Sequence, residues 1–153
     1  MISSKKNKTY KAPHQGLFKP NNPKKYVGNT SNIQYRSSWE KKFMRHCDRN
    51  PHILQWASEE MFVPYRSPID KRIHKYYPDF IVKMSDGRKL MIEVKPAVQC
   101  KPPKARSRKT KRYLQEQLTY IKNISKWKSA KEYCDDNGLE FVIMTEKELN
   151  IKH

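Results

Sequence analysis

Two stretches of sequence decide the fold of this chain: Tyr77-Pro78-Asp79-Phe80-Ile81-Val82 and Leu90-Met91-Ile92-Glu93-Val94-Lys95. Both are rich in β-branched and aromatic residues, which are typical of strands. Ser85-Asp86-Gly87 lies between them and predicts a tight turn. The two stretches are therefore expected to pair as an antiparallel hairpin.

The length of this turn decides which side chains face one another, because strand side chains alternate between the two faces of a sheet. A two-residue turn would place the Asp79 carboxylate opposite an apolar residue. A three-residue turn, with Gly87 in the left-handed conformation, places Asp79 opposite Glu93 and Phe80 opposite Ile92. We predict the three-residue turn, because it separates an apolar face from a face that carries both carboxylates.

The polar face of this hairpin carries Asp79, Glu93 and Lys95. Two carboxylates that lie close together repel, and each raises the pKa of the other. Mg²⁺ prefers carboxylate and carbonyl oxygens, and it would remove this repulsion. A bound cation can polarise a phosphodiester and lower the pKa of a water, while Lys95 positions that water or stabilises charge on the phosphate.

These residues resemble the PD-(D/E)XK nuclease signature, which Pro78-Asp79 and Glu93-Val94-Lys95 match. The upstream segment 35–43 resembles the start of the TnsA-type transposon endonuclease domain and supplies Glu40 as a further acid. The downstream segment 139–149 is also similar to TnsA proteins. One position departs from them, because TnsA proteins carry Gln where this chain has Glu93. Glu is the commoner residue in the wider family.

The resemblance implies a restriction-endonuclease-like α/β fold, with an αβββαβ core and a mixed central sheet flanked by helices. It implies Mg²⁺ as the cofactor, with Mn²⁺ as a substitute, and no nucleotide cofactor. The implied catalytic residues are Glu40, Asp79, Glu93 and Lys95. The implied metal ligands are Asp79, Glu93, the Val94 carbonyl and Glu40, the last through water.

Simpler interpretations exist for each motif. A Pro-Asp pair before an apolar strand is common, and Glu-x-Lys on a strand is often a solvated cross-strand pair. Ser37 and Glu40 have the spacing of a capping box, so Glu40 has a structural role that competes with metal binding. Glu40 therefore ranks below Asp79 and Glu93 as a site residue.

The composition indicates a polyanionic partner. The 153 residues carry a net charge of +18, which favours double-stranded DNA as the partner. A membrane surface is disfavoured, because the sequence offers no apolar run of spanning length and no amphipathic helix with a long apolar face. Cys47, Cys100 and Cys134 lack a CxxC spacing and are expected to be reduced thiols rather than zinc ligands.

Residues 1–34 are predicted to form a basic N-terminal arm, and residues 35–153 the nuclease domain. The arm has seven lysines and no acid, and it lacks a hydrophobic period. It is expected either to stay disordered until bound or to lie extended over the domain. Gripping DNA or the capsid and acting as a solubilising tail are both open roles. Deleting it is expected to leave the domain folded.

The remaining elements follow from periodicity and capping signals. A helix begins after Ser37 and ends at Pro51, and strand-like pieces at 53–57 and 61–65 follow it. Residues 67–75 are expected to form a polar loop. Two helices, separated at 123–125 and ending at Gly138, lead to a buried strand at 139–144 and a short capped helix. The first three strands should be antiparallel, and the last should join the sheet in parallel.

Basic residues that flank the carboxylates are expected to contact DNA phosphates. They lie in two segments, the polar loop and a second loop at 101–112 that carries seven basic residues and no acid. The predicted DNA-binding residues are Arg66, Lys71, Arg72, His74, Lys101, Lys104, Arg106, Arg108, Lys109, Lys111 and Arg112.

Together these observations predict a Mg²⁺-dependent DNA endonuclease with little sequence specificity, since no base-reading module is recognisable. The chain is also similar to the small head-completion nucleases of T4-like tailed phages. That similarity implies action in phage head completion after DNA packaging, in the host cytoplasm or in the virion head, with head or portal proteins as partners. The alternatives are a non-catalytic DNA-binding structural head protein on the same fold and a protein that acts on RNA.

Overall fold

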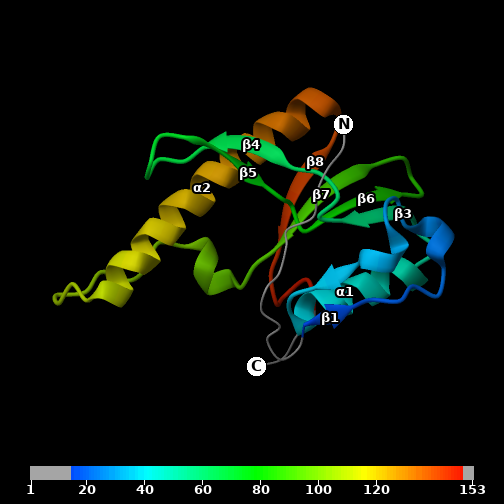
Figure 1. The fold of residues 1–153 in the computed structure, drawn as a ribbon, viewed down its shortest axis with the longest axis horizontal. Helices are drawn as coiled ribbons and strands as arrows, with labels where there is room; N and C mark the ends of the chain where they lie inside the picture. The colour runs from blue at the N-terminus through cyan, green and yellow to red at the C-terminus, as the bar shows by residue number, and fades with distance from the viewer. Residues whose placement is uncertain (1–14, 150–153) are drawn as a thin grey trace.

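The computed structural model of this chain describes residues 15–149. Its centre is a mixed four-stranded sheet with the strand order β3-β6-β7-β8. The strands are β3 (Ile53–Ser58), β6 (Phe80–Met84), β7 (Lys89–Val94) and β8 (Glu140–Met144). The first three are antiparallel, and β8 joins β7 in parallel. Helix α1 (Ser38–Arg49) and helix α2 (Lys111–Asn137) cover opposite faces of this sheet (Figure 1). The predicted restriction-endonuclease-like α/β architecture is confirmed.

The predicted register of the β6–β7 hairpin is also confirmed. Phe80 pairs with Ile92, and Lys83 pairs with Lys89. The turn has three residues, and Gly87 closes it with a φ of 94°. This positive φ is easily adopted only by glycine, so the residue fixes the turn length and with it the register.

The larger part of the core lies between α1 and the sheet. Phe43, Met44 and Cys47 project from α1 onto Phe80 and Ile92. Ser37 caps the helix, since its Oγ accepts the Glu40 N–H at 3.1 Å. Asn50 ends the helix directly before Pro51, as the sequence indicates.

The α2 face differs from the predicted polar face. Ile81, Met91 and Ile143 pack there against Trp127 and Ala130 of α2. The expectation that this face is mainly polar is wrong, because α2 covers most of it. The carboxylates lie only where this cover ends, at the end of β7.

Helix α2 is one continuous helix, so the predicted break at 123–125 is wrong. Ser125 does not cap a new helix, because its hydroxyl donates to the Arg66 carbonyl at 3.0 Å. Asn123 and Trp127 are buried, and Trp127 packs in the core under this helix. Gly138 ends the helix with a φ of 71°, as predicted.

A separate two-stranded ribbon lies between β3 and β6 in the chain. It consists of β4 (Val63–Arg66) and β5 (Ile73–Tyr76), paired so that Tyr65 faces His74. The prediction of a loop over 67–75 is therefore wrong for β5. The ribbon lies along α2 (Figure 1), where Tyr65 and Tyr76 join the core under that helix.

The N-terminal segment from residue 15 also differs from the prediction. Phe18, Tyr26 and Ile33 are buried members of the main core, and two of these rings pack edge-on against Trp56. Short elements order the segment: β1 (Gly16–Leu17), η1 (Pro23–Lys25), η2 (Thr30–Asn32) and β2 (Gln34–Tyr35). Residues 15–34 are thus part of the folded core rather than an accessory arm. The rest of the predicted arm, residues 1–14, lies outside the described residues.

The three cysteines are free thiols, as expected, and Cys47 and Cys134 are buried. Strand β8 is half-buried rather than fully buried. A short 3-10 helix, η3 (Ala97–Cys100), follows β7. Within residues 15–149 no helix is long and apolar enough to cross a membrane. The predicted last helix is a capped turn in its described part, where the Glu148 carboxylate accepts the Thr145 N–H at 2.7 Å.

Candidate active site

Asp79 lies at the entrance of β6, directly beside the end of β7. Its Oδ2 accepts the Val94 backbone N–H at 2.8 Å. The register that pairs Phe80 with Ile92 places Pro78 opposite Val94. Because proline has no N–H, it cannot donate to the Val94 carbonyl, which lies on the same side of the strand as the Val94 N–H. The Pro-Asp pair therefore leaves a backbone carbonyl without its ladder partner next to a carboxylate.

Glu93, on β7, lies opposite Asp79 in the register of the hairpin. Its side chain is buried, and its Oε2 accepts a hydrogen bond of 2.5 Å from the Tyr76 hydroxyl on the ribbon. Its Oε1 lies 3.7 Å from Lys95 Nζ. The Lys95 backbone N–H donates to the Met144 carbonyl at 2.9 Å, so strand β8 fixes the position of the lysine. The predicted trio of Asp79, Glu93 and Lys95 is thus brought together.

The two carboxylates interact electrostatically. Burial raises the pKa of Asp79 well above its usual value, and the charges of Glu93 and Glu40 raise that pKa further. Such a carboxyl destabilises the metal-free fold as the pH rises through its folded pKa, because the unfolded chain ionises more easily. A divalent cation would favour the ionised form and release a proton on binding.

Glu40 lies at the edge of this group and keeps its capping role. Its carboxylate accepts a hydrogen bond from the Ser37 hydroxyl at 3.1 Å. Burial raises the pKa of Glu40, and the charge of Glu59 raises it further. Glu59 is itself buried and paired with Arg36, whose Nη2 lies 2.8 Å from Glu59 Oε2.

The side chains near the end of β7 offer few ligands for a divalent cation. Among residues 15–149 no three His, Cys, Asp or Glu side chains converge closely enough to hold one ion. Two carboxylates and a neighbouring carbonyl remain, from Asp79, Glu93 and Val94. Mg²⁺ commonly binds through one or two carboxylates and keeps several waters, so the chemistry of these donors fits Mg²⁺.

Three residues of this region were not predicted from the sequence: Tyr76, Arg36 and Glu59. Tyr76 directly follows the segment 67–75 that was expected to be a loop, and no sequence pattern indicated its contact with Glu93. Glu59 has a φ of 52°, an unusual conformation for glutamate. No local motif relates it to Arg36, which is 23 residues away.

Tyr76→Phe is expected to weaken Mg²⁺ binding about 10- to 100-fold, because it removes a hydrogen bond that orients a candidate ligand. The ring would still fill its place in the core, so the fold should persist. Titration calorimetry with Mg²⁺ measures the effect. Tyr65→Phe is the matched control, since Tyr65 is buried on the neighbouring strand and its ring lies under the same Lys126 side chain. Equal losses in both variants would contradict an orienting role for the Tyr76 hydroxyl.

The predicted DNA-binding residues lie in two exposed groups. The ribbon and its turn carry Arg66, Lys71, Arg72 and His74. His74 Nε2 lies 2.7 Å from Asp70 Oδ2. The segment between β7 and α2 carries Lys101, Lys104, Arg106, Arg108 and Lys109, and α2 begins with Lys111 and Arg112. Both groups extend away from α1 (Figure 1).

Comparison with known proteins gives two findings. The family described as TnsA-like endonuclease N-terminal domain matches residues 50–146. This range includes Asp79, Glu93 and Lys95 and excludes α1 with Glu40. The chain is also 36% identical over 137 residues to the head completion nuclease of Enterobacteria phage T4, covering 87% of this chain and 91% of the T4 protein.

Proposed function

Since this chain belongs to the TnsA-like endonuclease family, we propose that it is a Mg²⁺-dependent DNA endonuclease that acts in phage head completion. The observation that carries the proposal is the convergence of Asp79, Glu93 and Lys95 at the end of β7. The hydrogen bond that the Val94 N–H donates to the Asp79 carboxylate and the 3.7 Å approach of Lys95 to Glu93 hold the three in one group. A protein that only binds DNA would not need two neighbouring carboxylates on that surface.

The residues of the site have separate roles in this proposal. Asp79, Glu93 and the Val94 carbonyl hold the cation, and Glu40 adds negative charge at the edge through water. When bound, Mg²⁺ supplies a Lewis acid for the phosphodiester and a lower pKa for an attacking water. Lys95 orients that water and stabilises the charge that develops on the phosphate. Tyr76 orients Glu93.

Double-stranded DNA is the proposed substrate, and the two basic groups are its contact surface. Both groups are exposed, and they contribute to the net charge of +18 that the chain carries. Contacts of this kind read the phosphate backbone rather than the base sequence. We propose weak sequence preference, because no base-reading module is recognisable in the sequence.

The place of action follows from the phage relative, which is a head completion nuclease. We propose that this chain also works during particle assembly in the host cytoplasm, after DNA packaging, with head or portal proteins as partners and the virion head as a further location. A cleavage assay tests the enzymatic part directly. Purified protein would be incubated with linear, circular and branched DNA, with Mg²⁺, with Mn²⁺ and with chelator. DNA binding without DNA cleavage under every divalent metal would favour the alternative of a non-catalytic head protein.

Neutralising Lys104, Arg106, Arg108 and Lys109 together is expected to weaken DNA binding and to flatten its salt dependence. Each lost phosphate contact should reduce the slope of log K against log salt by about 0.9. The metal site should remain intact, since none of these side chains contacts Asp79 or Glu93. Binding isotherms at several salt concentrations measure the change. Lys83, Arg88 and Lys89 provide the control, because they lie around the β6–β7 turn at the opposite end of the strands. A slope that falls equally in the control would contradict a specific role for the loop.

A further inference from the structure

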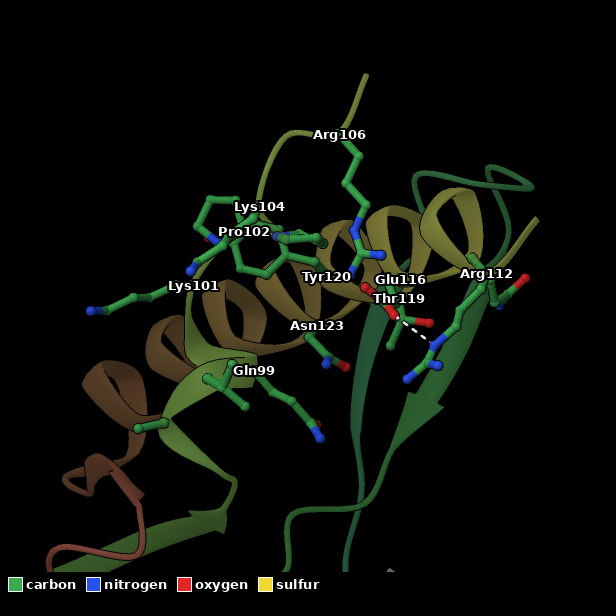
Figure 2. A pocket seen from close by; sticks show the side chains of 14 residues that line it. Gln99, Lys101, Pro102, Lys104, Arg106, Arg112, Glu116, Thr119, Tyr120 and Asn123 are labelled. Carbon is green, nitrogen blue, oxygen red and sulfur yellow. Dashed lines mark hydrogen bonds and ion pairs between the residues drawn. The ribbon is translucent and has the colours of Figure 1, made fainter. Parts of the chain in front are cut away.

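A cleft of about 890 Å³ lies between α2 and the segment that precedes it (Figure 2). Its walls come from residues 97–106 and from the face of α2 between Arg112 and Asn123. Ligand clefts in proteins commonly enclose about 300–1,000 Å³. Neither Asp79 nor Glu93 lines this space, so it is separate from the candidate active site.

Asn123 is the most informative residue of the cleft. It is only 8% exposed, yet it lines the cleft from the buried side of α2. No hydrogen bond joins its side-chain amide to the other residues of 15–149, and the amide atoms are open to the cleft rather than sealed in the core. This amide offers both N–H donors and a carbonyl acceptor to whatever occupies the cleft. Its chemistry therefore fits a ligand that presents both a donor and an acceptor on one edge.

The rim of the cleft is positively charged. Lys101, Lys104 and Arg106 lie there without an acidic partner among the described residues. Arg112 is paired with Glu116, at 3.2 Å between Nε and Oε1 (Figure 2). This leaves a cationic rim above a nearly buried amide, which suits a ligand that is anionic at one end only.

The wall of the cleft also has apolar surface. Pro102, Pro103 and the Tyr120 ring contribute to it, and Val98 is 79% exposed at its edge. A planar aromatic group packs well on such a surface, and stacking of a base on an aromatic side chain is worth about 1–3 kcal/mol. An anion alone, such as phosphate, would leave this surface and the Asn123 amide unused.

We propose that this cleft binds a nucleotide. The base would lie against Tyr120 and present its hydrogen-bonding edge to Asn123, and the phosphate would lie among Lys101, Lys104 and Arg106. The nucleotide has two possible sources with the same chemistry, a free deoxynucleoside monophosphate and an unpaired nucleotide of a DNA strand. The inference stands on the cleft alone and does not depend on nuclease activity.

Binding is tested with wild-type protein and Asn123→Leu, by calorimetry in chelator so that no DNA is cut. The probes are the deoxynucleoside monophosphates, a short single-stranded oligonucleotide, a blunt duplex and inorganic phosphate. Wild-type protein should bind a monophosphate or the single strand more tightly than phosphate, and Asn123→Leu should weaken that binding about tenfold. Asn137→Leu is the matched control, because Asn137 is exposed at the far end of α2, and it should bind as wild type does.

Two further measurements separate the outcomes. In wild-type protein labelled with ¹⁵N, the Asn123 side-chain amide resonances should shift when the nucleotide is added, which requires no variant that might unfold. Asp79→Ala should keep nucleotide binding, so a failure of the nuclease proposal is distinguishable from a failure of this one. Monophosphate binding identifies a free nucleotide, and single-strand binding alone identifies a nucleotide within DNA. Binding no tighter than that of phosphate, or unshifted Asn123 resonances, would overturn the inference.

Discussion

Asp79→Ala is expected to lower Mg²⁺-dependent DNA cleavage by roughly a thousandfold or more, while DNA binding persists. The change removes a carboxylate from the proposed metal ligands, and metal assistance is worth several kcal/mol in the transition state. Binding should be kept or tightened, because one negative charge near the phosphates is lost and the basic groups remain. The fold should also survive, since burial and neighbouring charges already raise the pKa of Asp79 and make its ionised form costly.

Cleavage would be measured in Mg²⁺ and binding in Ca²⁺, which prefers a different coordination geometry and is expected not to support turnover. Asp86→Ala is the matched control. It removes the same charge from the same hairpin, but Asp86 is exposed in the turn at the other end of the strands. Equal activity losses in both variants, or a joint loss of cleavage and DNA binding, would contradict the assignment of Asp79 as a metal ligand.

Deleting residues 1–34 is expected to abolish stable folding, which reverses the expectation from the sequence. The deletion removes Phe18, Tyr26 and Ile33 from the core and exposes Trp56. Each large core side chain contributes about 2–5 kcal/mol, so their combined loss approaches the whole stability of a typical domain. Asp48 would also lose the two hydrogen bonds of 2.9 Å that its carboxylate accepts from the backbone N–H groups of Asn21 and Asn22.

Thermal unfolding followed by circular dichroism measures this effect. A chain that begins at residue 15 is the control, because it keeps every contact described for the N-terminal segment. The shorter chain should lack a cooperative transition, and the control should retain one. Cooperative unfolding of the shorter chain near the wild-type temperature would show that residues 15–34 contribute little to the core.

The hairpin and its register could be predicted because their determinants are local. Gly87 sets the turn, and the turn then aligns Asp79 with Glu93 through simple alternation. The ends of α1 and α2 were predictable for the same reason, since Ser37 and Gly138 act on neighbouring backbone groups. The motif residues Asp79, Glu93 and Lys95 lie on or next to this hairpin.

Features that depend on distant contacts were not predictable in this way. The ribbon strand β5 has a polar sequence and exists because it pairs with β4 and covers α2. The helix continues through 123–125, where the Ser125 hydroxyl donates a hydrogen bond to the Arg66 carbonyl on the ribbon. A helical sequence pattern does not predict a contact of this kind. The N-terminal segment has no hydrophobic period, yet its scattered Phe18, Tyr26 and Ile33 fit gaps in a core built by other elements.

The parallel pairing of β7 with β8 determines when the candidate active site can assemble during synthesis. During synthesis the ribosome makes Asp79, Glu93 and Lys95 well before it makes residues 140–144, and domains fold as units once their elements are present. Lys95 takes its place by donating its backbone N–H to Met144, and Glu93 lies beside Ile143. An incomplete nascent chain therefore carries Asp79, Glu93 and Lys95 without their arrangement. The proposed metal site can therefore assemble only when translation of β8 is finished.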